Sequence, residues 1–490
     1  MWGVGVVPKF MYMKANIVPI SYDREAVTSS ILHIGVGNFH RAHQEFYTNE
    51  LLNMAGNRTW GVTGAMLLPQ DRPVFEALKG QGCEYTLTEC AADGRRVCRR
   101  IGSLCDVVFG PDDPQAVIDL IGNCGTRIIS LTITEGGYNI DPATGEFDID
   151  NSAVRADLTA DVPTSVFGYM AHGLNMRRHR GCGPVTVLSC DNLRHNGTTA
   201  RRAFMTFFEA FDPELARWAE SNVTFPNSMV DRITPATTPE DVERLNRENG
   251  THDAAPVMCE DFIQWVIEDD FAAGRPSWQR AGVEFTSDVA PYENMKLSLL
   301  NASHTMLAYP AILSGYRRVD HAVHDARLAR LVRQFMDLDM TPYVPAPEGV
   351  DLELYKDTLM KRFANAAVSD QVARLCADGL SKFPVYITPK LIAMLRDGKD
   401  TRRLAYLLAA YRHYLRQGRD DDGAELTINE PMMTEMDRRL TASDDPLDFL
   451  ALSAFAGAPL SESPDFREQY LNYADSIASL GAMATLETVL

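Results

Sequence analysis

Ile31-Leu-His-Ile-Gly35-Val-Gly37-Asn-Phe-His40-Arg41 reads as a strand that runs into a tight turn and then into a helix. The two glycines would let the backbone turn sharply and approach a pyrophosphate, and the helix that follows offers N–H groups and a positive dipole end. The third glycine of the usual G-x-G-x-x-G pattern is missing, because His40 stands in its place. Glycine pairs also occur in ordinary turns after strands, so the segment predicts a dinucleotide-binding turn only in combination with its surroundings.

Asp71 follows a second expected strand at residues 60–67. In a dinucleotide-binding fold, an acidic residue after the second strand accepts hydrogen bonds from the adenosine ribose and repels a 2′-phosphate. The side chain could equally cap the helix that begins with Arg72-Pro73. The first interpretation favours NAD over NADP.

Strand-like and helical runs alternate through the first half of the chain. Strands are expected at 85–88, 127–134 and 185–189, and helices at 114–121 and 199–211. This alternation is typical of a mostly parallel, doubly wound sheet. Two polar clusters follow strand ends, where ligands bind but turns also occur, and a third lies in an otherwise apolar segment and is harder to explain as an ordinary loop. They lie at 132–138, 189–193 and 225–235.

The strand signals fade after about residue 288, and helical patterns take over. Helices are expected at 355–363, 389–395 and 402–416, and a loop rich in proline at 342–350. We therefore predict a Rossmann-type α/β domain with an N-terminal extension at 1–287 and a largely α-helical domain at 288–490. Within the second domain, a helix should end at Gly379, and Lys382 should lie in the loop that follows it.

The stretch Lys296-Leu-Ser-Leu-Leu-Asn301-Ala-Ser-His304 also reads as helix. At about 100° per residue, its lysine, amide and imidazole fall on one arc of about 140°. Three leucines share that arc, which predicts that the polar groups face inward: Leu297, Leu300 and Leu307. An amine that takes a proton, beside an amide and a ring that hold an oxygen, suits alcohol oxidation. A buried helix with incidental polar residues is the alternative.

Composition narrows the class of protein. The 490 residues exceed one ordinary core, and the net charge of −19 argues against nucleic acid or an anionic membrane as the main partner. Nine scattered cysteines without a C-x-x-C pair favour reduced thiols in a cytoplasm and argue against a zinc site. No run approaches the length of a membrane span. The apolar opening at 1–7 lacks the features of a signal peptide, and Met11 or Met13 could be alternative starts.

Taken together, six segments resemble the polyol-specific long-chain dehydrogenase/reductase family, from about residue 30 to the C-terminus. They occur in the order and at the spacing of that family. They are Gly35-Val-Gly-Asn-Phe-His-Arg-Ala-His-Gln44, Thr132-Ile-Thr-Glu-Gly-Gly-Tyr138, Ser189-Cys-Asp-Asn-Leu193, Phe225-Pro-Asn-Ser-Met-Val-Asp-Arg-Ile-Thr-Pro235, Lys296-x-x-x-Leu-Asn-x-x-His304 and Asp378-Gly-x-Ser-Lys-x-Pro384.

The resemblance implies NAD as the cofactor, no metal, and an active site between the two domains. It implies that Lys296 is the general acid/base, that Asn192 and Asn301 hold the reacting oxygen, and that His304 orients it. It also implies a proton-releasing carboxylate, three residues for sugar hydroxyls, and a cofactor site. In this sequence these are Glu293; Asp231, Arg374 and Lys382; and Gly35, Gly37, Asn38, Phe39, Arg41 and Asp71.

The family implies a polyol and its ketose as substrates, with mannitol and fructose first, arabinitol and xylulose second, and mannonate and fructuronate third. Gln70 stands where close relatives can carry a second acid, so NADP is the second choice of cofactor. The oligomeric state expected is a monomer or a weak homo-oligomer.

Three other interpretations remain. Tyr292-x-x-x-Lys296 matches the catalytic pair of short-chain dehydrogenases, in which the tyrosine is the base, but those enzymes are about half as long as this chain. A zinc-dependent polyol dehydrogenase would need a Cys/His/Glu ligand set that the sequence does not offer. A sugar or nucleotide sensor without turnover would not need a base such as Lys296.

Overall fold

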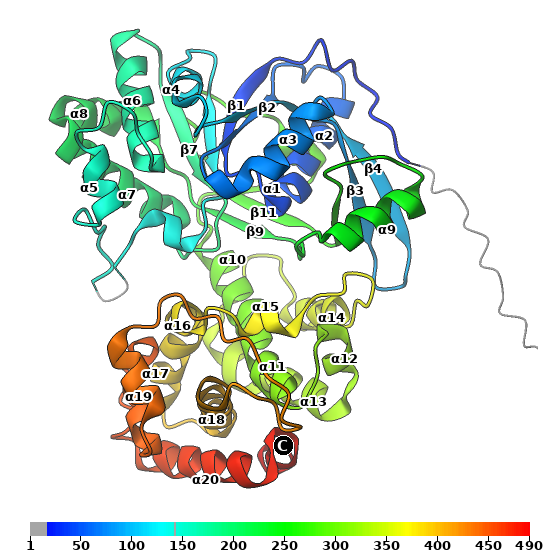
Figure 1. The fold of residues 1–490 in the computed structure, drawn as a ribbon, viewed down its shortest axis with the longest axis vertical. Coiled ribbons are helices and arrows are strands. Elements are labelled where there is room, and N and C mark those ends of the chain that lie inside the picture. Colours follow the sequence, from blue (N-terminus) through cyan, green and yellow to red (C-terminus); the bar gives the residue numbers. More distant parts are fainter. Residues whose placement is uncertain (1–16, 142–143) are drawn as a thin grey trace, which may run out of the picture.

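The computed structural model describes residues 17–141 and 144–490, so the apolar opening and the alternative start methionines lie outside the described residues. The α/β half is built on a six-stranded sheet in the order β5-β2-β1-β6-β7-β8, in which all neighbours are parallel (Figure 1). The predicted doubly wound sheet is confirmed. Its strands are β1 (Ser29–Ile34), β2 (Gly61–Met66), β5 (Leu104–Phe109), β6 (Ile128–Leu131), β7 (Val185–Ser189) and β8 (Val223–Thr224).

Helices cover both faces of this sheet because successive side chains of a strand point to opposite faces. In β1, Ile31 belongs to one apolar cluster and Leu32 to another. The cluster around Leu32 is closed by α4 (Pro114–Ile121), α6 (Val166–His179), α7 (Asn196–Phe211) and α8 (Pro213–Asn222). The cluster around Ile31 is closed by α2 (Gln44–Asn53) and α3 (Arg72–Gly80). Both faces are therefore buried, as a parallel sheet requires.

Two smaller sheets complete this half. One pairs β10 (Val257–Glu260), β3 (Tyr85–Cys90) and β4 (Arg96–Ile101), and the other pairs β12 (Glu284–Thr286), β11 (Gln264–Glu268) and β9 (Ser228–Asp231). The strand expected at 85–88 exists, but its assignment to the alternating βα pattern is wrong. A short connection leads from β3 back into β4, and such a connection joins antiparallel strands.

The second half is helical, and the last strand ends at Thr286. The expected helices are present as α14 (Leu352–Phe363), α17 (Thr388–Arg396) and α18 (Arg402–Gln417). Around α11 (Ala302–Leu313) and α18 pack α13 (Ala326–Gln334), α15 (Val372–Cys376), α20 (Pro464–Leu480) and α21 (Ala482–Val489). The domain boundary at 287/288 itself stays a prediction.

Two local predictions in this half need correction. Gly379 does not end a helix: it begins α16 (Gly379–Lys382), which runs on into a π-helical turn at Phe383–Ile387. Lys382 therefore closes a short helix and does not lie in a loop. The proline-rich loop at 342–350 is irregular as expected, except that a 3-10 turn at Thr341–Tyr343 opens it.

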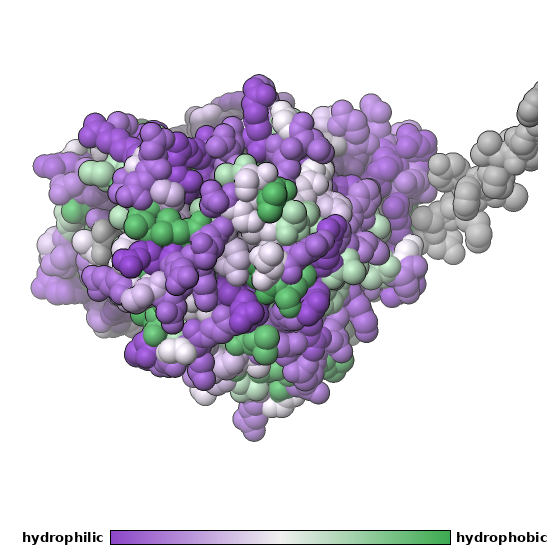
Figure 2. All heavy atoms as spheres, turned by 90° about the horizontal axis from the view of Figure 1, so that it is seen from below, coloured by the Kyte–Doolittle hydropathy of each residue, from purple (hydrophilic) through white to green (hydrophobic). Residues whose placement is uncertain are grey.

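The prediction of reduced thiols throughout is wrong for one pair, because Cys124 and Cys182 form a disulfide while the other seven cysteines are free. These two residues follow α4 and α6, which pack side by side. No helix in residues 17–141 and 144–490 is long and apolar enough to cross a membrane. The face of the helical half in Figure 2 is largely hydrophilic, with hydrophobic spots scattered over it. The cytoplasmic location and the oligomeric state stay predictions.

Candidate active site

The Lys296–His304 stretch connects the two halves of the molecule. The chain leaves β12, forms α10 (Ala290–Met295), and continues through Lys296–Asn301 into α11, with α10 at the junction of the halves in Figure 1. The predicted α-helix is wrong for the first six residues, which form a π-helix. A π-helix bonds each residue to the fifth one along, so Lys296 and Asn301 lie on the same side of it. The convergence expected from the sequence is thus kept by a different geometry.

Lys296 is 5% exposed. Its Nζ donates a hydrogen bond to Oδ1 of Asn192, in the bend after β7. Burial lowers the pKa of Lys296, because the charged ammonium loses solvation, while the carboxylate of Asp231 opposes that shift. A sheltered amine with a lowered pKa is thereby held against the carboxyl edge of the parallel sheet.

Asn301 and His304 carry polar atoms that the described residues do not satisfy. Oδ1 of Asn301 and Nε2 of His304 are buried and have no hydrogen-bond partner in the described part of the chain. The His304 ring packs on Phe363 with ring centroids 4.5 Å apart. Burial lowers the pKa of His304 to about 3, so the imidazole is neutral near pH 7. Leaving such atoms unpaired costs about 1–3 kcal/mol each, a cost that a bound hydroxyl would remove.

Glu293 lies on α10 one turn before Lys296 and is also buried. Its oxygens accept hydrogen bonds from the backbone N–H of His195 at 3.0 and 3.2 Å, and its Oε2 lies 3.7 Å from Nδ1 of that residue. Burial raises the pKa of Glu293. Since the His195 side chain is 59% exposed, the carboxylate lies between Lys296 and a ring in contact with solvent.

Asp231 ends β9 and faces a neighbour that the sequence did not predict. Arg362 of α14 binds its two oxygens at 2.7 and 2.9 Å and binds both oxygens of Glu260 at 2.7 and 2.9 Å. Burial would raise the pKa of Asp231, but the charge of Arg362 outweighs this effect and lowers it. All three side chains are buried. The binding of sugar hydroxyls by Asp231 stays a prediction, because its carboxylate is already paired.

Arg374 and Lys382 are also engaged within the protein. Arg374 forms a two-point ion pair with Asp370, at 2.7 and 2.5 Å, and its side chain is 49% exposed. Nζ of Lys382 donates to three carbonyl oxygens at the end of α15: those of Ala377 at 2.6 Å, Leu375 at 3.2 Å and Arg374 at 3.4 Å. A lysine at a helix C-terminus has this structural role independently of any ligand. Their binding of substrate stays a prediction.

The glycine turn has the features that a pyrophosphate requires. Gly35 has φ +99°, and a Cβ there would lie 2.1 Å from the carbonyl oxygen of Thr132, so a larger residue is excluded. A Cβ at Gly37 would meet no atom within 4 Å, so at this second position the backbone borders open space. The two glycines thus do different work: the first shapes the turn, and the second leaves room beside α1 (Asn38–Ala42).

Three other predicted cofactor residues surround this turn. Arg41 is buried and donates to Ala255 O at 2.6 Å and to Oδ1 of Asn38 at 2.5 Å, so it braces the turn from inside. Phe39 stacks on His43 with centroids 4.9 Å apart. Direct contact of these residues with a cofactor stays a prediction.

Asp71 ends a 3-10 turn (Pro69–Asp71) after β2. Its side chain accepts no capping hydrogen bond from α3 in the described structure, which removes the capping role considered from the sequence. Burial raises its pKa. The carboxylate is thus available at the end of the second strand.

The prediction left out two residues: Asp191, which supports the site, and Lys390, whose hydrogen bonds go to neighbouring elements and to none of the predicted site residues. Asp191 is buried and accepts from Thr134 N at 2.9 Å, Ile133 N at 3.1 Å and the Tyr138 hydroxyl at 2.8 Å. It therefore ties together the two polar clusters that the sequence suggested. Lys390 of α17 donates to Oδ1 of Asn294 at 2.8 Å and to Tyr343 O at 2.9 Å, and burial lowers its pKa to about 8.

Tyr292 and Lys296, the alternative catalytic pair, contact different neighbours. Tyr292 packs against an apolar cluster of Met229, Val266 and Val289, whereas Lys296 binds Asn192. Among residues 17–141 and 144–490, no three His, Cys, Asp or Glu side chains are grouped so that they could hold a metal ion. The arrangement instead offers one amine, two amides and a neutral imidazole.

Comparison with known proteins places both halves in one family. The family model for the mannitol dehydrogenase Rossmann domain matches residues 29–280, and that for the mannitol dehydrogenase C-terminal domain matches 288–478. The polyol:NADP oxidoreductase of Gluconobacter oxydans is 43% identical, over 91% of this chain and 92% of that protein. The D-mannonate oxidoreductase of Escherichia coli is 36% identical, over 91% of this chain and 92% of that protein. A mannitol 2-dehydrogenase of Pseudomonas fluorescens, solved with NAD and D-mannitol, superposes with a TM-score of 0.91 at 40% identity, over 96% of each chain.

Proposed function

Because the chain belongs to the mannitol dehydrogenase family of oxidoreductases, we propose that it oxidises a secondary hydroxyl of a polyol to a ketone with NAD, reversibly and without a metal. D-mannitol and D-fructose are the favoured pair. The observation that carries this proposal is the buried amine of Lys296 at Asn192, on the same π-helix as the unpaired amide oxygen of Asn301.

Lys296 acts as the general base in the oxidation direction. A free lysine, with a pKa of about 10.4, would be protonated at neutral pH, and burial lowers that pKa towards the working range. The NH2 groups of the Asn192 and Asn301 amides hold the substrate oxygen and donate to it as it gains negative charge. Asn192 can do so while its Oδ1 accepts from Lys296, because the amide oxygen and the amide nitrogen bond independently. His304, kept neutral by burial, orients the same oxygen. NAD, held by the residues around Gly35, Gly37 and Asp71, would supply the acceptor for the hydride that leaves the carbon.

The proton taken by Lys296 leaves through Glu293, the buried carboxylate one turn away. Asp231 and its partner Arg362 hold the charge balance beside the amine, because the carboxylate raises the pKa of Lys296 and the guanidinium lowers it. Arg374, half exposed beside its partner Asp370, contacts the substrate hydroxyls. Asp231 and Lys382 shape this side of the site through their internal bonds. The oxygens of Asp231 can accept a further hydrogen bond from a hydroxyl, whereas Lys382 would have to exchange one of its carbonyl partners for one.

NAD fits the residues present. Open space beside Gly37 admits the pyrophosphate, and Asp71 carries an uncapped carboxylate for the adenosine ribose. A carboxylate at that position repels a 2′-phosphate, so NAD is the preferred cofactor. The relative named polyol:NADP oxidoreductase keeps NADP as the competing choice, as does the uncharged Gln70 beside Asp71.

The test is a panel of initial rates of NADH or NADPH formation, with excess chelator present. Mannitol, sorbitol, arabinitol and mannonate would each be offered with NAD and with NADP. Rapid NAD-linked oxidation of mannitol that survives the chelator is the expected result. A preference for mannonate would move the substrate to a hexuronate, as in the E. coli relative. NADH binding without turnover of any of these substrates would favour a sensor, and loss of activity in chelator would overturn the metal-free chemistry.

A further inference from the structure

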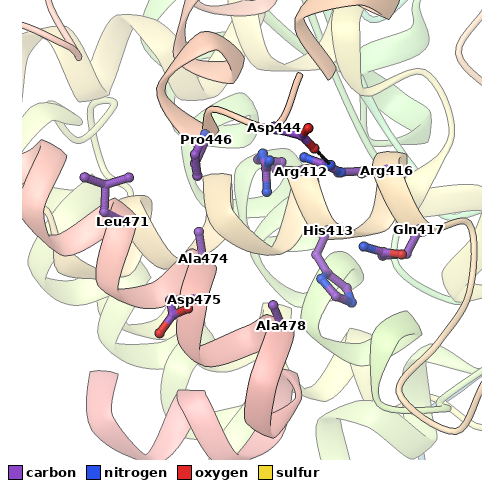
Figure 3. Close-up of a pocket in the computed structure, with 10 residues that line it drawn as sticks. All are labelled: Arg412, His413, Arg416, Gln417, Asp444, Pro446, Leu471, Ala474, Asp475 and Ala478. Carbon is purple, nitrogen blue, oxygen red and sulfur yellow. Dashed lines mark hydrogen bonds and ion pairs between the residues drawn. The ribbon is translucent and has the colours of Figure 1, made fainter. Parts of the chain in front are cut away.

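A cavity lies in the helical half. It has a volume of about 490 Å³ and opens between α18, α20 and the turn before the 3-10 segment Pro446–Ala451 (Figure 3). One wall carries polar side chains of α18, namely Arg412, His413, Arg416 and Gln417, and the opposite wall carries Leu471 and Ala474 of α20. Cavities of about 300–1,000 Å³ hold small molecules of metabolite size.

The polar wall carries positive charge in a chain whose net charge is −19. Arg412 and Arg416 are one helical turn apart and project towards the same end of the cavity in Figure 3. Two acids also line the cavity: Asp475 of α20, and Asp444, which accepts from Nη2 of Arg416 at 2.6 Å and has a fully exposed side chain. The pair between Asp444 and Arg416 is the one that an anion would have to displace. Because that ion pair is exposed to solvent, it contributes little and can yield to a better anion.

The hydrogen bonds that these guanidinium groups make within the protein do not satisfy all of their donors. Arg412 and Arg416 both donate to the carbonyl oxygen of Ser443, the residue that follows α19 (Glu435–Ala442), and the distance from Arg412 is 3.2 Å. Arginine commonly has this role at a helix C-terminus. Yet Nε of Arg412 is buried and has no hydrogen-bond partner among the described residues. A buried donor without an acceptor is unfavourable, and an oxyanion would satisfy it once Arg412 turns its guanidinium towards the cavity.

We propose that this cavity is a binding site for a sugar phosphate, separate from the Lys296 site. The paired guanidinium groups match the oxygens of a phosphate monoester, which arginine binds through two parallel hydrogen bonds. His413 and Gln417 offer donors and acceptors for hydroxyls further along the cavity, and Leu471 with Ala474 gives an apolar surface for a sugar ring. Burial lowers the pKa of His413, so a neutral imidazole that can donate and accept faces those hydroxyls. The proposal does not depend on the function proposed above.

Calorimetric titration of the full-length protein tests it with glucose 6-phosphate, inorganic phosphate and uncharged glucose as probes. We expect one equivalent of glucose 6-phosphate to bind, more tightly than phosphate, and glucose to give no comparable signal. Arg412→Gln should weaken glucose 6-phosphate at least about tenfold, since it removes a charged, two-point contact. The matched control is Arg419→Gln, because Arg419 follows the same helix but pairs with the exposed Glu425 outside the cavity.

Two further variants keep the test decisive if Arg412→Gln unfolds. Arg416→Gln removes the second guanidinium, and Ala478→Trp fills the cavity from α20 while leaving both arginines in place. Each should weaken binding while Arg419→Gln does not. Absence of binding, or binding that all three cavity variants leave unchanged, would overturn the site. Equal affinity for phosphate and glucose 6-phosphate would overturn the sugar phosphate in favour of a simple anion.

Discussion

The segments 296–304 and 374–382 both supply side chains that the sequence predicted for the active site, but they differ in what those side chains contact. In the first, Asn301 and His304 keep buried polar atoms unpaired within the described structure. In the second, Arg374 is paired with Asp370, and Lys382 donates to three carbonyl oxygens. Since unpaired buried atoms are costly, we infer that the first segment is shaped for a ligand. In the second segment Lys382 serves the protein's own architecture, and only the half-exposed Arg374 is left to reach a substrate.

Lys296→Met should have the largest effect on turnover, because it removes the buried amine that binds Asn192 and that is proposed as the general base. Turnover should fall by about 10²–10⁴-fold, the usual contribution of a general acid/base, with NADH affinity unchanged. Steady-state rates with the best polyol, together with NADH fluorescence titration, would measure both quantities. Lys390→Met is the matched control, since Lys390 is another buried lysine with hydrogen bonds to neighbours. Equal losses in the two variants would mean a structural effect and remove Lys296 from the base role.

Arg362→Met should cause the largest loss of stability. It would leave the carboxylates of Asp231 and Glu260 buried without their common partner. Removing one member of a buried ion pair costs about 3–5 kcal/mol. Urea unfolding monitored by circular dichroism gives the free energy of unfolding. Arg419→Met breaks an exposed pair with Glu425 instead and should change that value little. A loss below about 1 kcal/mol for Arg362→Met would show that the cluster does not hold the two halves in place.

Much of the fold followed from local patterns, and the parts that did not follow depend on distant partners. The helix at 114–121 and the strand at 185–189 match the structure residue for residue, because each is a single run with clear ends. The placement of β3 depends on β10, about 170 residues away in the chain, and no local pattern encodes that pairing. The disulfide between Cys124 and Cys182 likewise joins residues that are 58 positions apart.

The candidate site divides in the same way. Motifs identified Lys296, Asn301 and His304, but the π-helix that carries the first two cannot be read from a helical period alone. Arg362 was missed because it lies in a helix whose sequence shows only an ordinary surface arginine, and its partner Asp231 is 131 residues away. Sequence patterns thus identified which side chains are present, whereas tertiary contacts decide which of them remain free to bind.

Asn301→Ala should lower kcat by about 10²–10³-fold, the range observed when one donor to a developing oxyanion is removed. Stability should change little or rise, because the variant removes a buried oxygen that has no partner in the described residues. Initial rates and urea unfolding on the same preparation would test the combination. Thr305→Ala is a nearby control on α11 whose loss should leave kcat within a few-fold of the parent. A strong loss of stability with Asn301→Ala would indicate that this amide is structural.

The pH profile should reveal the lowered pKa of Lys296. Alcohol oxidation needs the neutral amine, so kcat/KM should rise with pH and then reach a plateau. The midpoint of the rise should lie below the ordinary lysine pKa of about 10.4. Between the two pKa values the unfolded chain binds more protons than the folded protein, so the free energy of unfolding should also rise with pH. Lys390 has a pKa of about 8 and could produce a similar midpoint, but Lys390→Met should leave the kinetic profile in place. If the kinetic pH dependence disappears in Lys390→Met, the group that titrates is Lys390 and not Lys296.

Lys382→Met should have the smallest effect and decide the comparison most directly. Its three hydrogen bonds to the end of α15 predict a loss of about 1 kcal/mol in the free energy of unfolding, typical of a cation at a helix C-terminus. Since all three donors are engaged, KM for the polyol should change less than about tenfold, which corresponds to less than ~1.4 kcal/mol of binding. Arg374→Met, which removes a half-exposed guanidinium at the same helix, should raise KM more. If Lys382→Met raises KM and leaves stability unchanged, Lys382 binds the substrate, and the second segment is then a binding surface like the first.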